Sequence, residues 1–184
     1  DRIFSGYMPF NPAYPEDGFE PDSARAMFDR GELDMFGEIA AQYLQLAPAD
    51  PELESFWAIA EELDIPVGYH MGPGVENPSI SIFPGYRASL TNPLLLEEVW
   101  DRQPSLRLFV MHAGWPMLAE MVAVLHTYPN VYVGISALDR LRDSPSYLRM
   151  LVEAGFEDRI MYGSDQMAWP ELIAPSVEAI EEAA

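Results

Sequence analysis

The sequence predicts an α/β protein of the (β/α)8-barrel (TIM barrel) type with about six of the eight strand-helix units present. Short apolar segments alternate with segments of helical apolar spacing along the chain. Dividing its 184 residues among six units gives about 31 residues per unit, the length that a strand, a crossover helix and their loops need. A complete barrel takes ~250 residues. We therefore expect residues 1–184 to form one domain, a barrel that lacks about a quarter.

Six apolar runs are the predicted strands. They lack alternating polar residues and contain Val, Ile and Tyr, which is typical of parallel strands covered on both faces. In chain order they are Ile3–Met8, Leu33–Ile39, Ile65–Tyr69, Leu106–Met111, Val131–Ile135 and Arg159–Tyr162. An open, doubly wound sheet of six parallel strands is the competing fold. The positions of the polar residues, described below, favour the barrel.

Proline marks the starts of four predicted helices, because its missing N–H costs nothing in the first turn. The four starts are Asp50-Pro51, Asn92-Pro93, Trp115-Pro116 and Ser144-Pro145. All but Trp115-Pro116 also supply a polar side chain that can cap the helix. Apolar residues at helical spacing then follow Pro51 and Pro116.

The composition excludes several classes of partner. A formal net charge of -20 repels polyanions, so we expect no binding to nucleic acid or to anionic membranes. No apolar run is long enough to cross a membrane, and the first residues lack the basic-then-apolar order of a secretory signal. The absence of Cys fits a cytoplasmic protein. The expected partner is a small-molecule substrate, and the sequence leaves open whether the chain forms a homo-oligomer.

Ionisable residues lie at the carboxyl ends of four predicted strands, where parallel α/β proteins form their shared cleft. His70 ends IPVGYH, His112 ends LRLFVMH, Asp165 follows RIMYGS, and Glu38 ends LDMFGE. A single histidine at a strand end is more often a hydrogen-bonded, half-buried residue. Two imidazoles and an Asp carboxylate together are instead the ligand set of Zn²⁺ or a related divalent ion. The set of three therefore predicts a metal site.

Glu38 and the third histidine have weaker assignments. Glu38 has three interpretations: it contacts the metal, it orients a ligand, or it pairs with an Arg at the rim. His126 lies within the helix that follows Pro116, just past Leu125. We interpret His126 as a residue near the carboxyl end of that helix, without a functional role.

The segment 71–92 is the longest stretch without clear periodicity, and it leaves directly from His70. Loops of this length inside compact domains are usually functional. Its Arg87 is a candidate for holding a substrate carboxylate in an otherwise acidic protein, with a solvated surface Arg as the alternative. Trp115, three residues past His112, is a candidate wall of the substrate pocket, with a core Trp at a helix start as the alternative.

The order of motifs resembles the amidohydrolase-related (amidohydrolase 2) family of metal-dependent hydrolases. From about Leu33 to the end, the matching motifs are GE, IPVGYHMG, NPLLLEEV, LRLFVMHAGWP, PNVYVGIS and DRIMYGSD. This family also contains decarboxylases that act on aminocarboxymuconate semialdehyde and γ-resorcylate. The resemblance implies a distorted (β/α)8 barrel with a divalent metal, commonly Zn²⁺, held by an HxH pair on strand one, a His on strand five and an Asp on strand eight.

The resemblance assigns roles to three residues of this chain. His70 matches the strand-five ligand and Asp165 the strand-eight ligand. His112 matches a strand-six His that contacts a second metal or, more often, the metal-bound water and substrate. No HxH occurs in these 184 residues, so the resemblance implies a fragment without the first two units and their metal ligands.

Three functions are then open. The leading one is metal-dependent hydrolysis of a small organic substrate, carboxylated or not, by a metal-activated water. His70 and Asp165 would hold the metal, Asp165 would also accept a proton from the water, and His112 would steady the oxyanion or shuttle a proton. The same site permits non-oxidative decarboxylation of a conjugated or aromatic carboxylic acid. A non-catalytic barrel remnant is the third, supported by the missing HxH pair.

Overall fold

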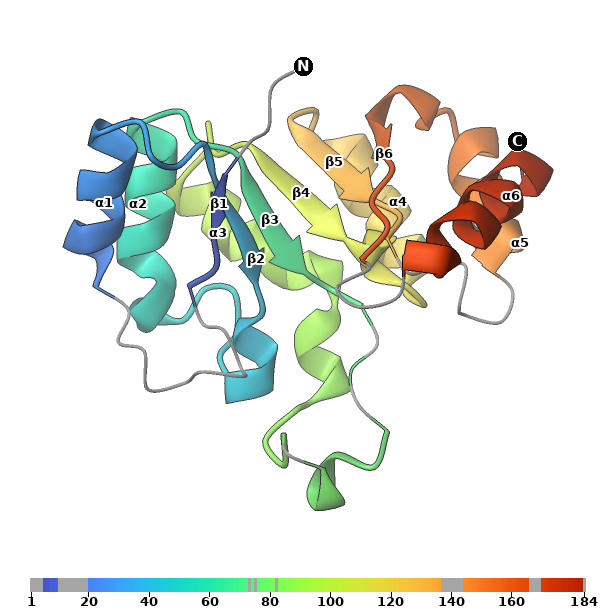
Figure 1. The fold of residues 1–184 in the computed structure, drawn as a ribbon, viewed down its shortest axis with the longest axis horizontal. Helices are drawn as coiled ribbons and strands as arrows, with labels where there is room; N and C mark the ends of the chain where they lie inside the picture. Colours follow the sequence, from blue (N-terminus) through green and yellow to red (C-terminus); the bar gives the residue numbers. More distant parts are fainter. Residues whose placement is uncertain are drawn as a thin grey trace.

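Six parallel strands form one curved sheet in the computed structural model, which describes residues 5–9, 20–72, 74, 76–81, 83–136, 144–165 and 170–183. The strands are β1 (Gly6–Tyr7), β2 (Met35–Ile39), β3 (Val67–His70), β4 (Leu108–Met111), β5 (Val131–Gly134) and β6 (Ile160–Met161). Their order in the sheet, β1-β2-β3-β4-β5-β6, is the order in the chain (Figure 1). A doubly wound sheet reverses its strand order at a switch point. The unbroken order is that of a barrel wall.

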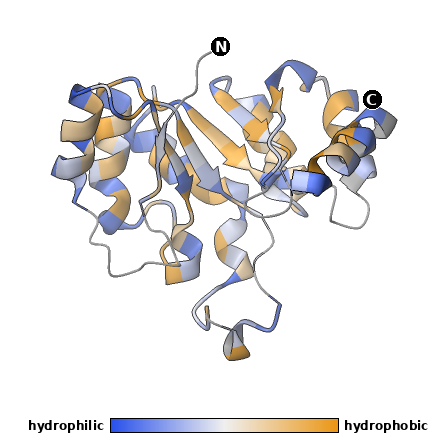
Figure 2. Cartoon of the chain, in the orientation of Figure 1, coloured by the Kyte–Doolittle hydropathy of each residue, from blue (hydrophilic) through white to orange (hydrophobic). Residues whose placement is uncertain are grey.

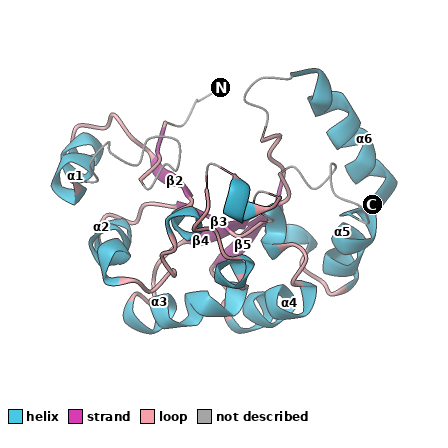
Figure 3. Ribbon diagram, turned by 90° about the horizontal axis from the view of Figure 1, so that it is seen from below, coloured by secondary structure: helices cyan, strands magenta, loops and turns pink. Residues whose placement is uncertain are grey.

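Helices cover the outer side of this wall. They are α1 (Pro21–Asp29), α2 (Glu54–Glu62), α3 (Glu97–Arg102), α4 (Leu118–Thr127), α5 (Ser144–Glu153) and α6 (Ile173–Ala183). Figure 3 shows them as an arc around the strands that is open between α1 and α6. The fold is therefore a partial (β/α) barrel, as the sequence predicts. None of the helices in the described ranges is long and apolar enough to cross a membrane.

All six predicted strands are present, although most are shorter than the apolar runs that predict them. Residues 3 and 4 of the first run lie outside the described residues. The face of the sheet that meets the helices is uniformly apolar, and Figure 2 shows β4 and β5 as largely hydrophobic. Its two central rows, each no more than 2% exposed, are Val67-Leu108-Val131 and Tyr69-Val110-Val133. Burying one such aliphatic side chain contributes roughly 1.5–3 kcal/mol, so these rows hold the helices on the sheet.

The inner face of the sheet carries the residues between those rows. Gly68, Phe109 and Tyr132 are in register there, followed by His70, Met111 and Gly134. A Cβ atom on Gly68 would lie 2.5 Å from the Phe109 ring, so only glycine leaves room for that ring. The alternation of faces along β3 therefore places His70 at the carboxyl end of the inner face.

The four proline signals mark the starts of helical segments, and two of these segments begin with a short 3-10 helix that the sequence did not predict. Asp50 accepts a hydrogen bond from the Glu52 N–H at 3.0 Å, and Asn92 accepts one from the Leu94 N–H at 3.0 Å, as expected of N-caps. Each cap begins a short 3-10 helix, Pro51–Leu53 or Pro93–Leu96, that leads into α2 or α3. Helix α4 begins two residues after Pro116, and α5 begins at Ser144, whose side chain is outside the described part.

Candidate metal centre

Three side chains converge at the carboxyl ends of β2, β3 and β4. The Glu38 Oε1 atom lies 3.7 Å from His70 Nε2 and 3.7 Å from His112 Nε2. The centroids of the two imidazole rings are 4.5 Å apart. One ligand atom from each residue lies within 4.8 Å of the other two. Because 3.7 Å is longer than a hydrogen bond, the three atoms surround a small space between them.

The donor set fits a divalent cation. Two imidazole nitrogens and one carboxylate oxygen bind Zn²⁺ and other divalent transition metals. Ligand atoms about 2.1 Å from one ion lie roughly 3.0–3.4 Å apart at tetrahedral or octahedral angles. The two 3.7 Å separations from Glu38 to the histidines therefore need to contract by about 0.3–0.7 Å. The side chains of His70 and His112 are each 8% exposed and that of Glu38 is 20% exposed, so little water competes for this space.

A break in strand pairing aims Glu38 at the two histidines. Phe36 pairs with Val67 and Ile39 pairs with Tyr69, so the register of β2 against β3 shifts between Phe36 and Ile39. An extra residue of this kind in a strand redirects a side chain out of the regular alternation. Glu38 lies within the shifted segment.

A tight turn after β4 presents His112. His112 and the following Ala113 have φ values of 54° and 48°, a left-handed conformation that is uncommon for residues other than glycine. His112 Nδ1 donates a hydrogen bond to the Ser136 carbonyl oxygen at 2.8 Å. Because a carbonyl oxygen only accepts, Nδ1 carries a proton and Nε2 is left to face Glu38. A Cβ atom on Gly72 would lie 2.6 Å from His112 Cδ2, so this ring position requires glycine at residue 72.

Side chains of η1 (Ala41–Leu44), the 3-10 helix after β2, surround His70. The amide nitrogen of Gln42, a fully buried residue, contacts His70 Nδ1. The Tyr43 ring meets the His70 ring edge-on at 5.4 Å between centroids. Tyr43 also packs against Phe83 at 4.9 Å and Tyr86 at 5.1 Å, both from the segment 71–92. The long loop predicted from the sequence therefore forms part of the wall beside His70.

The electrostatics of the centre separate the two histidines. Burial, reinforced by the charge of His112, lowers the pKa of His70 to about 4. Burial also lowers the pKa of His112, but Glu38, the Ser136 carbonyl and Asp165 outweigh it and raise that pKa above its ordinary value. Burial raises the pKa of Glu38, and the two histidines reverse this, so the pKa of Glu38 is lowered. Without a cation, His70 is therefore neutral near pH 7, whereas the surroundings of His112 favour its protonated form more than water does.

Asp165 lies on the same rim but outside the group of three ligand atoms. Its charge raises the pKa of His112, and it is among the causes that raise the pKa of Tyr43 to about 12, after burial, Tyr86 and Glu38. Asp165 follows β6 with φ 50°, again in the left-handed region. The structure brings His70, His112 and Glu38 together, and it places Asp165 beside them. Metal ligation by Asp165 stays a prediction.

The remaining predicted site residues have structural contacts. Arg87 donates from Nη1 to the carbonyl oxygens of Gly85 at 3.1 Å and Tyr86 at 2.9 Å, which braces its own loop. Trp115 is partly buried against the core. Their roles in substrate binding stay predictions. His126 lies in the last turn of α4, which confirms the position expected for it.

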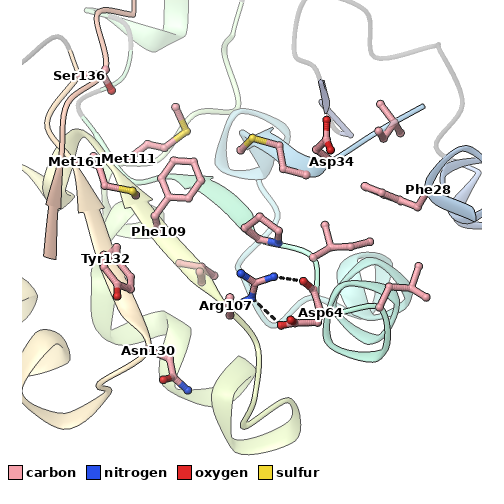
Figure 4. Close-up of a pocket in the computed structure, with 18 of the residues that line it drawn as sticks. Phe28, Asp34, Asp64, Arg107, Phe109, Met111, Asn130, Tyr132, Ser136 and Met161 are labelled. Atoms are coloured by element: carbon pink, nitrogen blue, oxygen red, sulfur yellow. Dashed lines mark hydrogen bonds and ion pairs between the residues drawn. The ribbon is translucent and has the colours of Figure 1, made fainter. Parts of the chain in front are cut away.

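A cavity of about 1060 Å³ extends along the inner face of the sheet. Figure 4 shows Phe109, Met111, Tyr132 and Met161 along it. Ser136 and Asp165 line its end near the candidate metal centre, whereas an ion pair of Arg107 Nε with Asp64 Oδ1 at 2.7 Å lies at the amino-terminal end of the strands. The cavity is therefore the largely apolar interior of the partial barrel.

Sequence reasoning missed Gln42, Tyr43 and the carbonyl of Ser136. Gln42 and Tyr43 follow Glu38 by four and five residues, at the carboxyl end of a predicted strand, so their position was a usable signal. A backbone carbonyl leaves no signal in a sequence.

Comparison with known proteins places the fold. No curated protein matches the chain. An uncharacterized TIM-barrel protein from Bordetella bronchiseptica matches with a TM-score of 0.61 and 15% identity over 97% of this chain and 66% of that one. The 5-carboxyvanillate decarboxylase from Sphingomonas paucimobilis matches with a TM-score of 0.59 and 19% identity over 89% of this chain and 58% of that one.

A dihydroxybenzoic acid decarboxylase from Polaromonas, with bound manganese and the inhibitor 2-nitroresorcinol, has a TM-score of 0.57 and 16% identity, over 90% of this chain and 60% of that one. The chain thus spans 58–66% of the length of these three structures. At these identities the likeness shows a shared fold. A family model described as amidohydrolase matches residues 17–183, almost the whole chain. With six consecutive parallel strands and this match, the chain belongs to the amidohydrolase family.

Proposed function

We propose that Glu38, His70 and His112 hold a divalent cation, and that the centre catalyses non-oxidative decarboxylation of a small aromatic or conjugated carboxylic acid. The observation that carries the proposal is the convergence of three ligand atoms within 4.8 Å at the ends of adjacent strands. A cation bound there supplies a Lewis acid that polarises substrate oxygens. Zn²⁺ is the ion that the sequence resemblance implies, and the manganese of the Polaromonas enzyme makes Mn²⁺ an equal candidate.

The substrate class rests on the structural neighbours. Two of them are decarboxylases of carboxylated aromatic compounds, and one holds a nitroresorcinol inhibitor. The sequence alone favours hydrolysis, and these neighbours support its alternative. A net charge of -20 opposes an anionic substrate, so its charge must be offset locally.

The residues of the chain supply proton transfer and hydrogen bonding. In decarboxylation the bond from the ring carbon to the carboxyl carbon breaks, its electron pair stays on the ring carbon, and CO₂ leaves. The ring carbon takes one proton, and we assign Asp165, beside His112, to relay it from water. Tyr43, whose pKa is raised to about 12, keeps its phenolic proton near pH 7 and can donate a hydrogen bond to a substrate oxygen.

Hydrolysis is the second candidate, and the position of Asp165 favours it. A carboxylate next to His112 can accept a proton from an attacking water, while His112 steadies the developing oxyanion. Decarboxylation and hydrolysis use the same residues and differ in the bond that breaks.

Product analysis separates the two reactions. The purified protein, in its full natural length and loaded with Zn²⁺ or Mn²⁺, is incubated with hydroxylated benzoic acids and, separately, with aryl esters and lactones. Decarboxylation predicts CO₂ release and, in D₂O, deuterium at the ring carbon. Incorporation of ¹⁸O from labelled water into an ester or lactone product, without CO₂ release, would instead identify a hydrolase. The variant His126→Gln, which changes a histidine in the last turn of α4 outside the group of three ligands, is the matched control for His70→Gln.

A further inference from the structure

Gln42 is a polar side chain enclosed beside the metal centre. It is 0% exposed, and its amide nitrogen contacts His70 Nδ1. Its Oε1 atom is also buried and has no hydrogen-bond partner in the described part of the chain. Buried polar atoms are rarely left unpaired. Among the described residues, this amide therefore has one hydrogen-bond partner, the imidazole ring of His70.

The contact matters because it decides which ring nitrogen carries the proton. A neutral imidazole has one N–H and one lone pair. With the amide nitrogen of Gln42 facing it, His70 Nδ1 accepts, and the ring proton resides on Nε2, which faces Glu38 Oε1 at 3.7 Å. In this tautomer Nε2 has no lone pair to offer a cation. Binding through Nε2 requires the proton on Nδ1, and hence an acceptor at Nδ1.

Gln42 can supply that acceptor without moving its backbone. A half-turn about the Cγ–Cδ bond exchanges the amide oxygen and nitrogen, which places Oε1 against Nδ1. Because Oε1 has no partner among the described residues, none of them opposes the half-turn through a bond to that atom. Thus the proton on the ring and the orientation of the amide change together.

We propose that Gln42 is a positioning residue that sets the tautomer of His70. Its amide nitrogen faces His70 in the metal-free protein, and its amide oxygen faces His70 when a cation is bound. This inference rests on the proposed metal centre, and it adds that loading of the centre is coupled to a rotation of the Gln42 amide. His112 needs no such change, because the Ser136 carbonyl always accepts from its Nδ1.

Nitrogen NMR on the wild-type protein tests the metal-free state directly. Two-bond ¹H–¹⁵N spectra of histidine-labelled protein distinguish Nδ1–H from Nε2–H, and His70→Gln assigns the signals. We expect the Nε2–H tautomer for His70 without metal and the Nδ1–H tautomer after addition of Zn²⁺. An Nδ1–H tautomer in the metal-free protein would overturn the proposal.

Substitutions test the coupling through metal affinity, measured by competition with a chelator. Gln42→Met keeps the approximate volume and removes the acceptor, so Zn²⁺ affinity should fall by about 10–100-fold. Gln42→Glu restores an acceptor and should bind Zn²⁺ at least as tightly as the wild type. Gln45→Met, an exposed glutamine three residues later, is the matched control and should leave the affinity unchanged.

The outcomes separate this inference from the proposed function. Equal losses in Gln42→Met and Gln42→Glu, or a Gln42→Met affinity within about twofold of the wild type, would reject the role of Gln42 while leaving the metal centre in place. If the wild type binds neither Zn²⁺ nor Mn²⁺, the metal centre itself fails. If Gln42→Met does not fold, as judged by circular dichroism, Gln42→Glu and the wild-type spectra still decide the matter.

Discussion

The two histidines of the metal centre are held in opposite ways. On the β4 side, His112 is fixed by the backbone carbonyl of Ser136 and by close packing of its ring against Gly72, which follows β3. On the β3 side, His70 is held by the side chains of Gln42 and Tyr43, which lie in η1, the 3-10 helix after β2. The β4 side is thus built to present its nitrogen at all times, whereas the β3 side can change its hydrogen bonding.

Removing a metal ligand should have the largest effect. We expect His70→Gln and Glu38→Gln to abolish stoichiometric binding of a divalent ion, a loss beyond the 10–100-fold of supporting residues. Elemental analysis after dialysis measures this, with His126→Gln as the control that keeps wild-type stoichiometry. Full metal occupancy in His70→Gln would show that the ion is held elsewhere.

A single added methyl group next to His112 should weaken metal binding. In Gly72→Ala the new Cβ would lie 2.6 Å from His112 Cδ2. Real Cβ atoms essentially never come this close to another atom, so the His112 ring must move. We expect Zn²⁺ affinity to fall by about 10–100-fold, as it does when a supporting residue is lost. Gly134→Ala, on the same inner face, meets only ordinary contacts at 3.6–3.9 Å and should bind as the wild type does. Equal affinities of both variants would contradict the tight packing.

The sequence predicted the frame of this centre better than its details. Apolar runs and proline caps located six strands and the helices between them, because burial on both faces and capping are local properties of the chain. The apolar runs also placed His70 and His112 at the carboxyl ends of strands. The position of Glu38 depends on a register shift between β2 and β3, and the support of His112 depends on the carbonyl of Ser136, two residues after β5. Pairing register and backbone contacts between distant segments are set by packing, which no local pattern encodes.

The pH dependence of stability should differ in sign between the two histidines in metal-free protein. The folded pKa of His70 is lowered from 6.5 to about 4, so the unfolded chain binds more protons between these values. His70 therefore contributes stability above pH 6.5 that is lost as the pH falls toward 4, by up to about 3 kcal/mol. The folded pKa of His112 is raised, so its contribution is present below pH 6.5 and is lost as the pH rises through the folded value.

Urea unfolding at several pH values measures this difference. Relative to the wild type, His70→Gln should flatten the loss of stability between pH 6.5 and 4. His112→Gln should flatten the loss on the alkaline side of pH 6.5 instead. If both variants change the profile in the same direction, the opposite electrostatics of the two sides are wrong.

Tyr43→Phe should give the smallest effect, and it separates binding of the metal from binding of the substrate. The substitution keeps the ring that packs against His70, Phe83 and Tyr86 and removes only the phenolic O–H. Metal affinity should be unchanged, because Tyr43 contributes no ligand atom to the group of three. Loss of one hydrogen bond to an anionic substrate costs about 1.5 kcal/mol, so kcat/KM for the decarboxylated acid should fall by about 10-fold. Unchanged kinetics would remove Tyr43 from the substrate side, whereas a parallel loss of metal would make it part of the flexible support of His70.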